Sequence, residues 1–447
     1  MAVPAHLRSD ALEIWRAGVS AVDSETLMQQ ALTICGTTLQ VCEHKVDLTV
    51  TNRIGVVGAG KAGAGMATAV ERIFTAAGFA DRLHGCVNVP SDCVRTLKSI
   101  QLHVGRPAGV NEPTLAGVSG SDQILKTVAD LEPQDACLVL LSGGGSALLP
   151  APHPSISLFD KQRVTQLLMQ RGATIDELNC VRKRLSRIKG GGLGRASQAG
   201  YNAALIISDV IGDPLDVIAS GPTVTNPDPP QAALDVLERY QLDSSTVPPS
   251  VIDLLHSQLQ TVPSTDRFHF ANHVIGNNQV AVLAACDHAL RLGYTVHNLG
   301  SANRGVAREV GQDLSSRARQ LRDSGAQPTC LISGGEPVVQ LARTERPRKG
   351  GRNQELVLAA LHACWTDSLD NIVVLSGGTD GEDGPTDAAG AFVDAEIMSR
   401  AKHLQLDPAA ALAINDSYHF FESCEGLLKT GPTHTNVMDV RVVLVAP

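Results

Sequence analysis

The sequence has few aromatic residues, no long run of basic residues and no paired cysteines. Aromatic side chains make up 3% of the 447 residues, so the core must be mainly aliphatic, as in parallel α/β sheets. The formal net charge is −9, and without a compensating basic domain a nucleic-acid partner is not expected. The ten cysteines are scattered singly, so their spacing suggests neither a disulfide framework nor a zinc knuckle.

Long apolar segments are also missing. No stretch approaches the roughly 20 residues that span a bilayer, and the first fifteen residues lack the apolar core of a signal peptide, so no membrane partner is expected. A cytoplasmic location is the default expectation. Arg8 and Arg16 are weak evidence for a mitochondrial presequence, because Asp10 and Glu13 lie among them. The residues do not choose between a monomer and a homodimer.

The chain is rich in glycine, with 41 residues. The most informative glycine-rich stretch is Leu138–Pro150 (LVLLSGGGSALLP). An apolar run leads into SGGGS, as when a buried parallel strand delivers its end to an anion site. Glycine lets an anion approach the backbone N–H groups, and the serines add hydroxyls. We therefore expect a phosphate-binding loop at these residues: Ser142, Gly143, Gly144, Gly145 and Ser146.

Three further apolar runs exit into glycine, at residues 54–65, 331–336 and 372–381. The first, IGVVGAGKAGAG, resembles a dinucleotide fingerprint, a weak match by itself. Its Lys61 favours neutralisation of an oxyanion or a phosphoryl group in transfer. Repetition of the pattern predicts facing ligand-binding loops, with these candidate residues: Gly58, Gly60, Gly335, Glu336, Thr379 and Asp380.

Charged residues mark two more places in the first half of the chain. In NCVRKRLSRIKGGGLG, Lys189 and Gly190 are candidate phosphate ligands, whereas the arginines suit a helix C-terminus and its dipole. The strand expected at 202–209 ends in Asp209, with Asp213 beyond it. These two carboxylates are candidates to hold Mg²⁺ or to accept a hydroxyl proton, and ordinary turn caps are the alternative.

A second strand–helix–strand series begins near His273, so we expect domains at 1–265 and 266–447. Within it Arg352 opens a helix, where a guanidinium and the helix dipole together clamp a carboxylate or phosphate. The acidic loop that holds Asp380 and Asp383 is a competing metal site. Further candidate binding residues of this half are Asn278, Asn353, Glu355 and Asn436.

Alternation of strands and helices predicts an α/β fold with a doubly wound, Rossmann-like parallel sheet in the first domain and a smaller α/β second domain. Helical spacing of apolar residues predicts two helices over 10–39. The segment NPDPP at 226–230 is typical of a linker.

Taken together, GAGKA, LLSGGGSALLPAP, ISDVIGDPLDVIASGPT, GGRNQEL, SGGTDGEDGPTDAAGA and TGPTHTNVMD resemble the class II glycerate kinases that carry a C-terminal MOFRL domain. The resemblance implies two α/β domains with an active site in the cleft between them. It also implies ATP and Mg²⁺ as cofactors, D-glycerate as substrate and phosphorylation, usually of the 2-hydroxyl. Lys61 and Arg352 take the positions of the family's catalytic pair, with Asp209 or Asp213 assisting the hydroxyl or Mg²⁺. The chain departs from the family pattern at Val306 and over 103–113.

Two other functions compete with this hypothesis. The GAGKAGAG stretch also suits an NADH-dependent reductase that converts hydroxypyruvate to glycerate, but that function has no use for the SGGGS, SGGTDG and GGRNQE loops. A non-enzymatic phosphosugar sensor would need a DNA-binding or partner domain, for which the sequence has no pattern.

Overall fold

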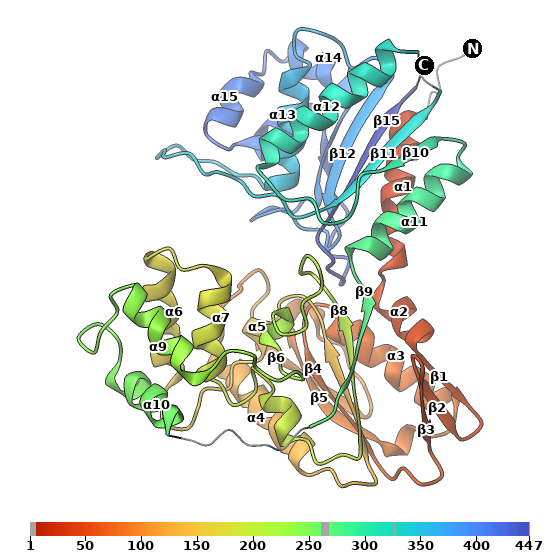
Figure 1. Ribbon diagram of the computed structural model, residues 1–447. Helices are drawn as coiled ribbons and strands as arrows, with labels where there is room; N and C mark the ends of the chain where they lie inside the picture. The colour runs from red at the N-terminus through yellow and green to blue at the C-terminus, as the bar shows by residue number, and fades with distance from the viewer. Residues whose placement is uncertain (1–5, 261–267, 326, 447) are drawn as a thin grey trace. The chain divides into compact units, whose positions relative to one another are not determined.

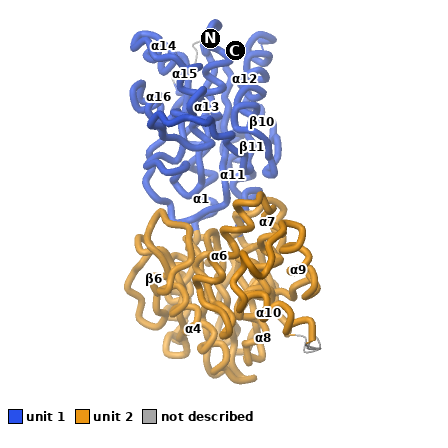
Figure 2. Tube along the Cα trace, turned by 90° about the vertical axis from the view of Figure 1, so that its left-hand side faces the viewer, with its two compact units in different colours: residues 1–23, 276–447 blue, residues 24–275 orange. Residues whose placement is uncertain are grey.

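The computed structural model describes residues 6–260, 268–325 and 327–446. The chain forms two compact units, a large unit of residues 24–275 and a C-terminal unit of residues 276–447 together with residues 1–23 (Figure 2). The boundary expected between residues 265 and 266 lies outside the described residues. The N-terminal helix belongs to the C-terminal unit because Trp15 is buried there and donates its indole N–H to the Gly377 carbonyl at 3.3 Å.

The large unit contains two sheets and several helices (Figure 1). Its strands are β1 (Leu32–Cys35), β2 (Thr38–Val41), β3 (His44–Asp47), β4 (Ile54–Ala59), β5 (Leu83–Pro90), β6 (Ile100–Arg106), β7 (Ala136–Leu141), β8 (Tyr201–Ile207) and β9 (Ala271–Gly276). Its helices are α2 (Ser24–Ala31), α3 (Gly63–Ala76), α4 (Leu115–Ala129), α5 (Gly145–Leu148), α6 (Leu158–Gln170), α7 (Ile175–Arg184), α8 (Gly192–Ala196), α9 (Pro230–Arg239) and α10 (Pro249–Leu259).

The main sheet has the order β6-β5-β4-β7-β8-β9. The pairings from β6 across to β8 are all parallel. Numbered along the chain, this is the 3-2-1-4-5-6 order of doubly wound folds, whose strand order reverses between the first and fourth strands. Here that switch point lies between β4 and β7, and ligands of such sheets bind beyond the strand ends at this place.

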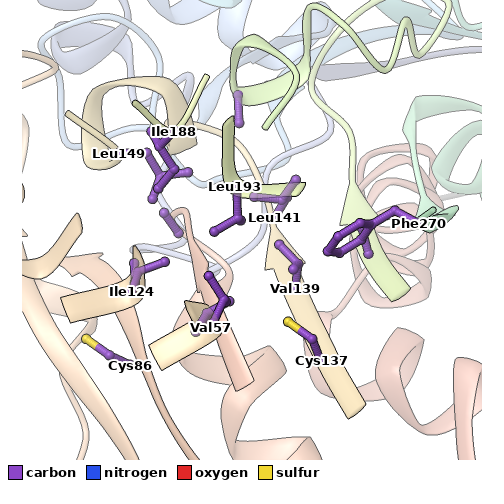
Figure 3. Close-up of a cluster of buried hydrophobic side chains, with 14 of the residues drawn as sticks. Val57, Cys86, Ile124, Cys137, Val139, Leu141, Leu149, Ile188, Leu193 and Phe270 are labelled. Carbon is purple, nitrogen blue, oxygen red and sulfur yellow. The ribbon is translucent and has the colours of Figure 1, made fainter. Parts of the chain in front are cut away.

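Aliphatic residues form the core beside these central strands (Figure 3). Val57 of β4 and Val139 of β7 are fully buried and share one cluster with Ile124 of α4 and Leu193 of α8. All six residues of β4 and of β7 are buried, which is what continuous apolar runs predict for central parallel strands. This packing fixes the strand ends on which the glycine loops stand.

A second apolar cluster belongs to helices α6, α7, α9 and α10, with Val164, Leu168, Val181 and Leu255 among its members. The NPDPP segment lies within the large unit, so the expectation of a linker was wrong. Pro229 caps α9, and Pro230 is its first residue, a position that tolerates proline because no intrahelical N–H bond is lost there.

The helix expected to continue to residue 39 ends at Ala31. Instead, residues 32–47 form the antiparallel three-stranded sheet β1-β2-β3. Gly36 turns the chain between β1 and β2 with φ of 58°, a conformation that glycine adopts readily. The β-branched pair Thr33 and Ile34 favours the strand that precedes it.

The C-terminal unit is built on one mixed sheet (Figure 1). Its strands are β10 (Thr295–Asn298), β11 (Thr329–Gly335), β12 (Ile372–Gly378), β13 (Gly390–Val393), β14 (Leu427–Leu428) and β15 (Asp439–Val445). Its helices are α1 (Leu7–Ala21), α11 (Asn278–Arg291), α12 (Ala307–Asp323), α13 (Arg352–Ala363), α14 (Ala395–His403), α15 (Pro408–Ala413) and α16 (Ser417–Cys424).

The order of this sheet is β10-β11-β15-β12-β13-β14. The central strand β15 is antiparallel to both β11 and β12. Helices α1 and α11 pack on each other and on the sheet, and α12 packs on α13 (Figure 1). The predicted fold class, two α/β domains with a doubly wound sheet in the first, is confirmed. Among the described residues, no helix is both long and apolar enough to cross a bilayer.

Candidate active site

The turn after β4 and the loop after β7 are bonded to each other at the switch point. The backbone N–H of Lys61 donates to the Gly143 carbonyl at 2.9 Å, and that of Ala62 donates to Ser142 Oγ at 3.0 Å. The N–H of Gly60 donates to the carbonyl of Asn88 at the end of β5, at 3.2 Å. Three consecutive N–H groups of the GAGKA turn therefore already have acceptors within the protein.

Close strand packing explains two glycines of the dinucleotide-like stretch. A Cβ on Gly58 would lie 2.0 Å from the Leu140 carbonyl oxygen, and a Cβ on Gly60 would lie 2.0 Å from Ser142 Oγ. Both distances are far inside van der Waals contact. These glycines let β4 approach β7, and their expected role as ligand contacts stays a prediction.

Replacement of Gly58 by alanine should therefore lower the free energy of unfolding of the ligand-free protein by about 3 kcal/mol, the upper end for overpacking a core. The matched control is Gly36→Ala, where the new Cβ meets no atom within 4 Å and only the positive φ opposes it, at a cost of about 1 kcal/mol. Urea unfolding measures both. Equal losses in the two variants would contradict the packing role.

Lys61 lies beside the glycine-rich loop. A Cβ on Gly144 would lie 3.9 Å from Lys61 Cγ and 3.1 Å from Arg106 Nη2, so two cationic side chains border this glycine. Gly144 has φ of 77°, which favours glycine. Arg106, the last residue of β6, is 3% exposed, and the sequence interpretation had not singled it out.

Next to this loop the large unit has a pocket of about 500 Å³. The pocket brings together six of the predicted site residues: Ser142, Gly144, Gly145, Ser146, Lys189 and Asp209. Basic side chains converge on Ser146 in its wall. Lys189 Nζ donates to the Ser146 carbonyl at 2.7 Å and to Ser146 Oγ at 2.8 Å, and Arg182 Nη2 donates to the same hydroxyl at 2.7 Å.

The hydrogen-bond partners of these two cations are neutral groups. Arg182 also donates to Asn179 Oδ1 at 3.3 Å, and Ser220 lies 3.0 Å from Ser146, hydroxyl to hydroxyl. Burial and the nearby charges of Arg182 and Lys161 lower the pKa of Lys189 well below its ordinary value. Arg182, which had been assigned to the dipole of a helix C-terminus, is thus part of the pocket wall.

The two aspartates that follow β8 differ in position. Asp209 lines the pocket, whereas Asp213 lies in the next turn with φ of 53°. Within the described residues, the one group of three clustered potential metal ligands is Cys42, Glu43 and His273. Asp209 and Asp213 of the large unit belong to no such group of the described residues.

Behind the pocket, the glycines after Lys189 are held by backbone bonds. Gly190 has φ of 55°, and its N–H donates to the Ser220 carbonyl at 2.9 Å. These contacts fix the turn that presents Lys189 to Ser146. Gly190 thus acts on the position of Lys189, and a direct ligand contact by its backbone stays a prediction.

In the C-terminal unit, Arg352 is the first residue of α13 and binds two carboxylates. Its Nε and Nη2 donate to both oxygens of Asp439, at 2.7 and 3.0 Å, and its Nη1 donates to Glu336 at 2.8 Å. Burial acts to lower the pKa of Arg352, but the negative charges of Asp439, Glu336 and Asp383 raise it above its ordinary value. The guanidinium is therefore fixed as a cation.

The first N–H groups of α13 already donate to a carboxyl group of the protein itself. The backbone N–H groups of Asn353 and Gln354 donate to the Asp383 carboxylate at 3.0 and 2.8 Å. The Asn353 side chain donates to Asp383 at 3.2 Å and to Asp439 at 3.0 Å. Burial raises the pKa of Asp383 to about 7, against the effect of these N–H groups. Asp439 was not among the predicted site residues, and Asp383 was named only as part of the competing metal loop.

The other predicted residues of this unit make contacts that brace loops and strands. Asn278 donates to the carbonyls of Val437 and Asp439 at 2.7 and 2.9 Å. Glu355 accepts from Arg308 and from Asn415, both at 2.7 Å. These bonds account for the Asn278 amide nitrogen and the Glu355 carboxylate without a ligand, whereas Asn278 Oδ1 has no hydrogen-bond partner among the described residues. A binding role for the two residues stays a prediction.

The remaining predicted site residues lie at the ends of strands or in the loops beside them. A Cβ on Gly335 would lie 2.2 Å from the Asn303 carbonyl oxygen. Thr379 donates its hydroxyl to the Met438 carbonyl at 2.7 Å, Asp380 accepts from the N–H of Glu382 at 3.1 Å, and Asn436 accepts from that of Met438 at 3.1 Å. The loops after β12 and before β15 are thus joined to each other.

Comparison with known proteins gives the family. Residues 10–256 match the model of a domain of unknown function, DUF4147, and residues 329–439 match the MOFRL family. A glycerate kinase of Danio rerio is 38% identical over 503 aligned positions, covering 99% of this chain and 98% of that protein. The chain belongs to the glycerate kinase family.

Other members of this family carry more than one name. A crystal structure of a glycerate kinase from Thermotoga maritima has a TM-score of 0.85 at 32% identity and covers 99% of this chain and 100% of that one. A candidate hydroxypyruvate reductase of Agrobacterium vitis is 38% identical, covering 88% of this chain and 87% of that protein. The two activities named among these relatives are thus two of the three functions that the sequence left in competition.

Proposed function

We propose that this protein is an ATP-dependent glycerate 2-kinase, which transfers the γ-phosphoryl group of ATP to the 2-hydroxyl of D-glycerate. The observation that carries the proposal is the cationic pocket beside the Ser142–Ser146 loop at the switch point of a doubly wound sheet. Phosphoryl transfer demands positioning and charge stabilisation rather than covalent chemistry. Family membership supports the same reaction, because relatives named glycerate kinase match this chain over nearly its whole length.

Lys61 and Arg352 are the proposed catalytic cations. In this proposal Lys61 stabilises the negative charge of the phosphoryl group in transfer, and Arg352 stabilises the charge of the phosphoryl group or of the glycerate carboxylate. The ion pairs of Arg352 with Asp439 and Glu336 orient its guanidinium. Asp209 accepts the proton of the attacking hydroxyl or binds the metal.

Magnesium fits the residues of the pocket wall. Asp209 and the hydroxyl of Ser142 are hard oxygen donors there, and Mg²⁺ bound with nucleotide phosphates needs only one or two protein carboxylates. Bound Mg²⁺ would neutralise phosphate charge. Asp209 is its proposed ligand in the large unit, and Asp213 and Asp380 are further proposed ligands.

The GAGKA turn gives a reason to favour the kinase over the reductase. A dinucleotide of the Rossmann type lays its pyrophosphate on backbone N–H groups of this turn and the following helix. Here the N–H groups of Gly60, Lys61 and Ala62 donate to protein acceptors. The glycines of the fingerprint are accounted for by strand packing, so this stretch does not favour NADH.

The position of the phosphate in the product tests the proposal. We would incubate the purified protein with D-glycerate, ATP and Mg²⁺ and record the proton-coupled ³¹P NMR spectrum of the phosphoglycerate. A phosphate on the secondary 2-oxygen couples to one proton and gives a doublet, whereas one on the primary 3-oxygen couples to two and gives a triplet. A triplet would replace the 2-kinase by a 3-kinase, and no new phosphate ester would contradict the kinase.

A further inference from the structure

Lys161 of α6 is a buried cation that the function described so far does not use. It is 5% exposed, and its Nζ has no hydrogen-bond partner among the described residues. It lines the same pocket as Ser146, Arg182 and Lys189. A buried ammonium without a partner is costly, which calls for a ligand that binds it.

The charges around Lys161 are mostly positive. Arg182 and Lys189 share its pocket, and Arg187 acts on it at longer range. The carboxylates that line the pocket are Glu112 and Asp209, of which Glu112 is exposed. On its own helix, Asp160 accepts from the N–H and hydroxyl of Ser157 at 2.9 and 2.8 Å. Burial and the charges of Arg182 and Arg187 lower the pKa of Lys161 to about 7.

We propose that Lys161, together with Arg182 and Lys189, binds the phosphate groups of a nucleoside polyphosphate. Three basic groups exceed what the single carboxylate of glycerate requires, whereas a di- or triphosphate carries several negative charges. The pocket of about 500 Å³ is also far larger than glycerate.

The rest of the wall suits the organic part of a nucleotide. Pro113, Met169, Ile175 and Val210 give it apolar surface, on which a base and a sugar can pack. The role of the bound nucleotide as phosphoryl donor rests on the proposed function. The binding of the nucleotide to this pocket does not.

Proton uptake is the signature of this arrangement. In the ligand-free protein near pH 8, Lys161 is mostly neutral, since burial lowers its pKa to about 7. Bound phosphate stabilises the ammonium form and raises that pKa, so binding must take up a proton. Affinity for the nucleotide then falls as the pH rises above about 7.

The test is isothermal titration calorimetry of the full chain with ADP and Mg²⁺ at pH 8, in buffers of different ionisation enthalpy. We expect the wild type to take up between about half a proton and one proton. Lys161→Met keeps the length of the side chain without its charge. It should weaken ADP binding about 10- to 100-fold, the effect of a lost charge-assisted hydrogen bond, and remove most of the proton uptake.

Thermal stability separates a binding role from a structural one. Because the buried ammonium lacks a partner, Lys161→Met should raise the Tm of the ligand-free protein at pH 7, whereas loss of a structural contact would lower it. The control is Lys126→Met on α4, an exposed position, which should change neither ADP affinity nor proton uptake. Arg182→Gln is a second variant that should weaken ADP binding.

Several outcomes would overturn the proposal. The first is an unchanged ADP affinity of Lys161→Met, and the second is the absence of proton uptake when the wild type binds ADP. The third is a Lys161→Met protein that loses affinity for D-glycerate but keeps its affinity for ADP. Failure of the proposed function is distinguishable, because the wild type would then bind ADP with proton uptake and yet release no ADP from ATP in the presence of D-glycerate.

Discussion

Lys61→Met lowers kcat for ATP-dependent phosphorylation of D-glycerate by about 10²- to 10³-fold, the usual effect of removing one group that stabilises transition-state charge. The loss is expected in kcat because the lysine charge matters most when the phosphoryl group is in transfer. The bonds that hold the turn are backbone bonds, from Lys61 N–H to Gly143 and from Ala62 N–H to Ser142. A change of side chain leaves them in place.

The measurement is steady-state ADP release with saturating D-glycerate, beside the Tm of each protein. Lys126→Met is the matched control, since it removes one positive charge from an exposed position of the same unit. A Lys61→Met enzyme within about threefold of the wild type would remove Lys61 from the catalytic residues. A large fall in Tm would instead assign the lysine to folding.

The second large effect is expected for Arg352→Lys, with kcat/KM lowered about 100-fold or more. Lysine keeps the charge beside Asp439 but lacks the planar fork that now reaches both Asp439 oxygens and Glu336. Because Asp439 is fully buried, the retained charge is needed to avoid an unpaired carboxylate in the core. The charge-conserving variant therefore tests chemistry more cleanly than alanine does.

Arg317→Lys is the control for the kcat/KM measurement on Arg352→Lys. Arg317 lies on the exposed side of α12 in an ion pair with Asp313, and such surface pairs contribute about 0–1 kcal/mol. Unchanged kcat/KM in Arg352→Lys would make the guanidinium a structural partner of Asp439 and Glu336 alone. The location of the active site between the two domains stays a prediction.

Much of the large unit could be predicted from residue patterns. Continuous apolar runs such as 54–57 and 138–141 are buried on both faces and lie side by side in a parallel sheet. The glycine loops mark the strand ends, and the sheet order brings two of them together at the switch point. Ser146 and Lys189, 43 positions apart, were both selected for their chemistry, and they are in direct contact.

What the patterns missed depends on tertiary packing. Lys161 was not singled out in the sequence, because nothing in the residue pattern shows that its ammonium is buried in the folded chain. Arg182 satisfied a local rule for helix C-termini, so sequence reasoning had no signal for its place in the pocket. Asp439 begins a strand and looks structural until Arg352 is placed against both its oxygens.

Local rules also failed where they compete. At residues 32–47, helical spacing of Leu32 and Ile34 was outweighed by a turn glycine and strand pairing. At Pro229 and Pro230, the same residues suit a linker and a helix start, and the helix formed because Val236 and Leu237 bury its apolar face. The first case was decided by a local hairpin, and the second by packing against residues distant in sequence.

One measurement tests the central claim most directly. Purified protein is given ATP, Mg²⁺ and D-glycerate while ADP release is followed, and in parallel it is given NADH and hydroxypyruvate while NADH oxidation is followed. We predict ADP release that requires D-glycerate, is lost in Lys61→Met and Arg352→Lys, and comes without NADH oxidation. NADH oxidation without ADP release would contradict phosphoryl transfer and return the GAGKAGAG stretch to a dinucleotide.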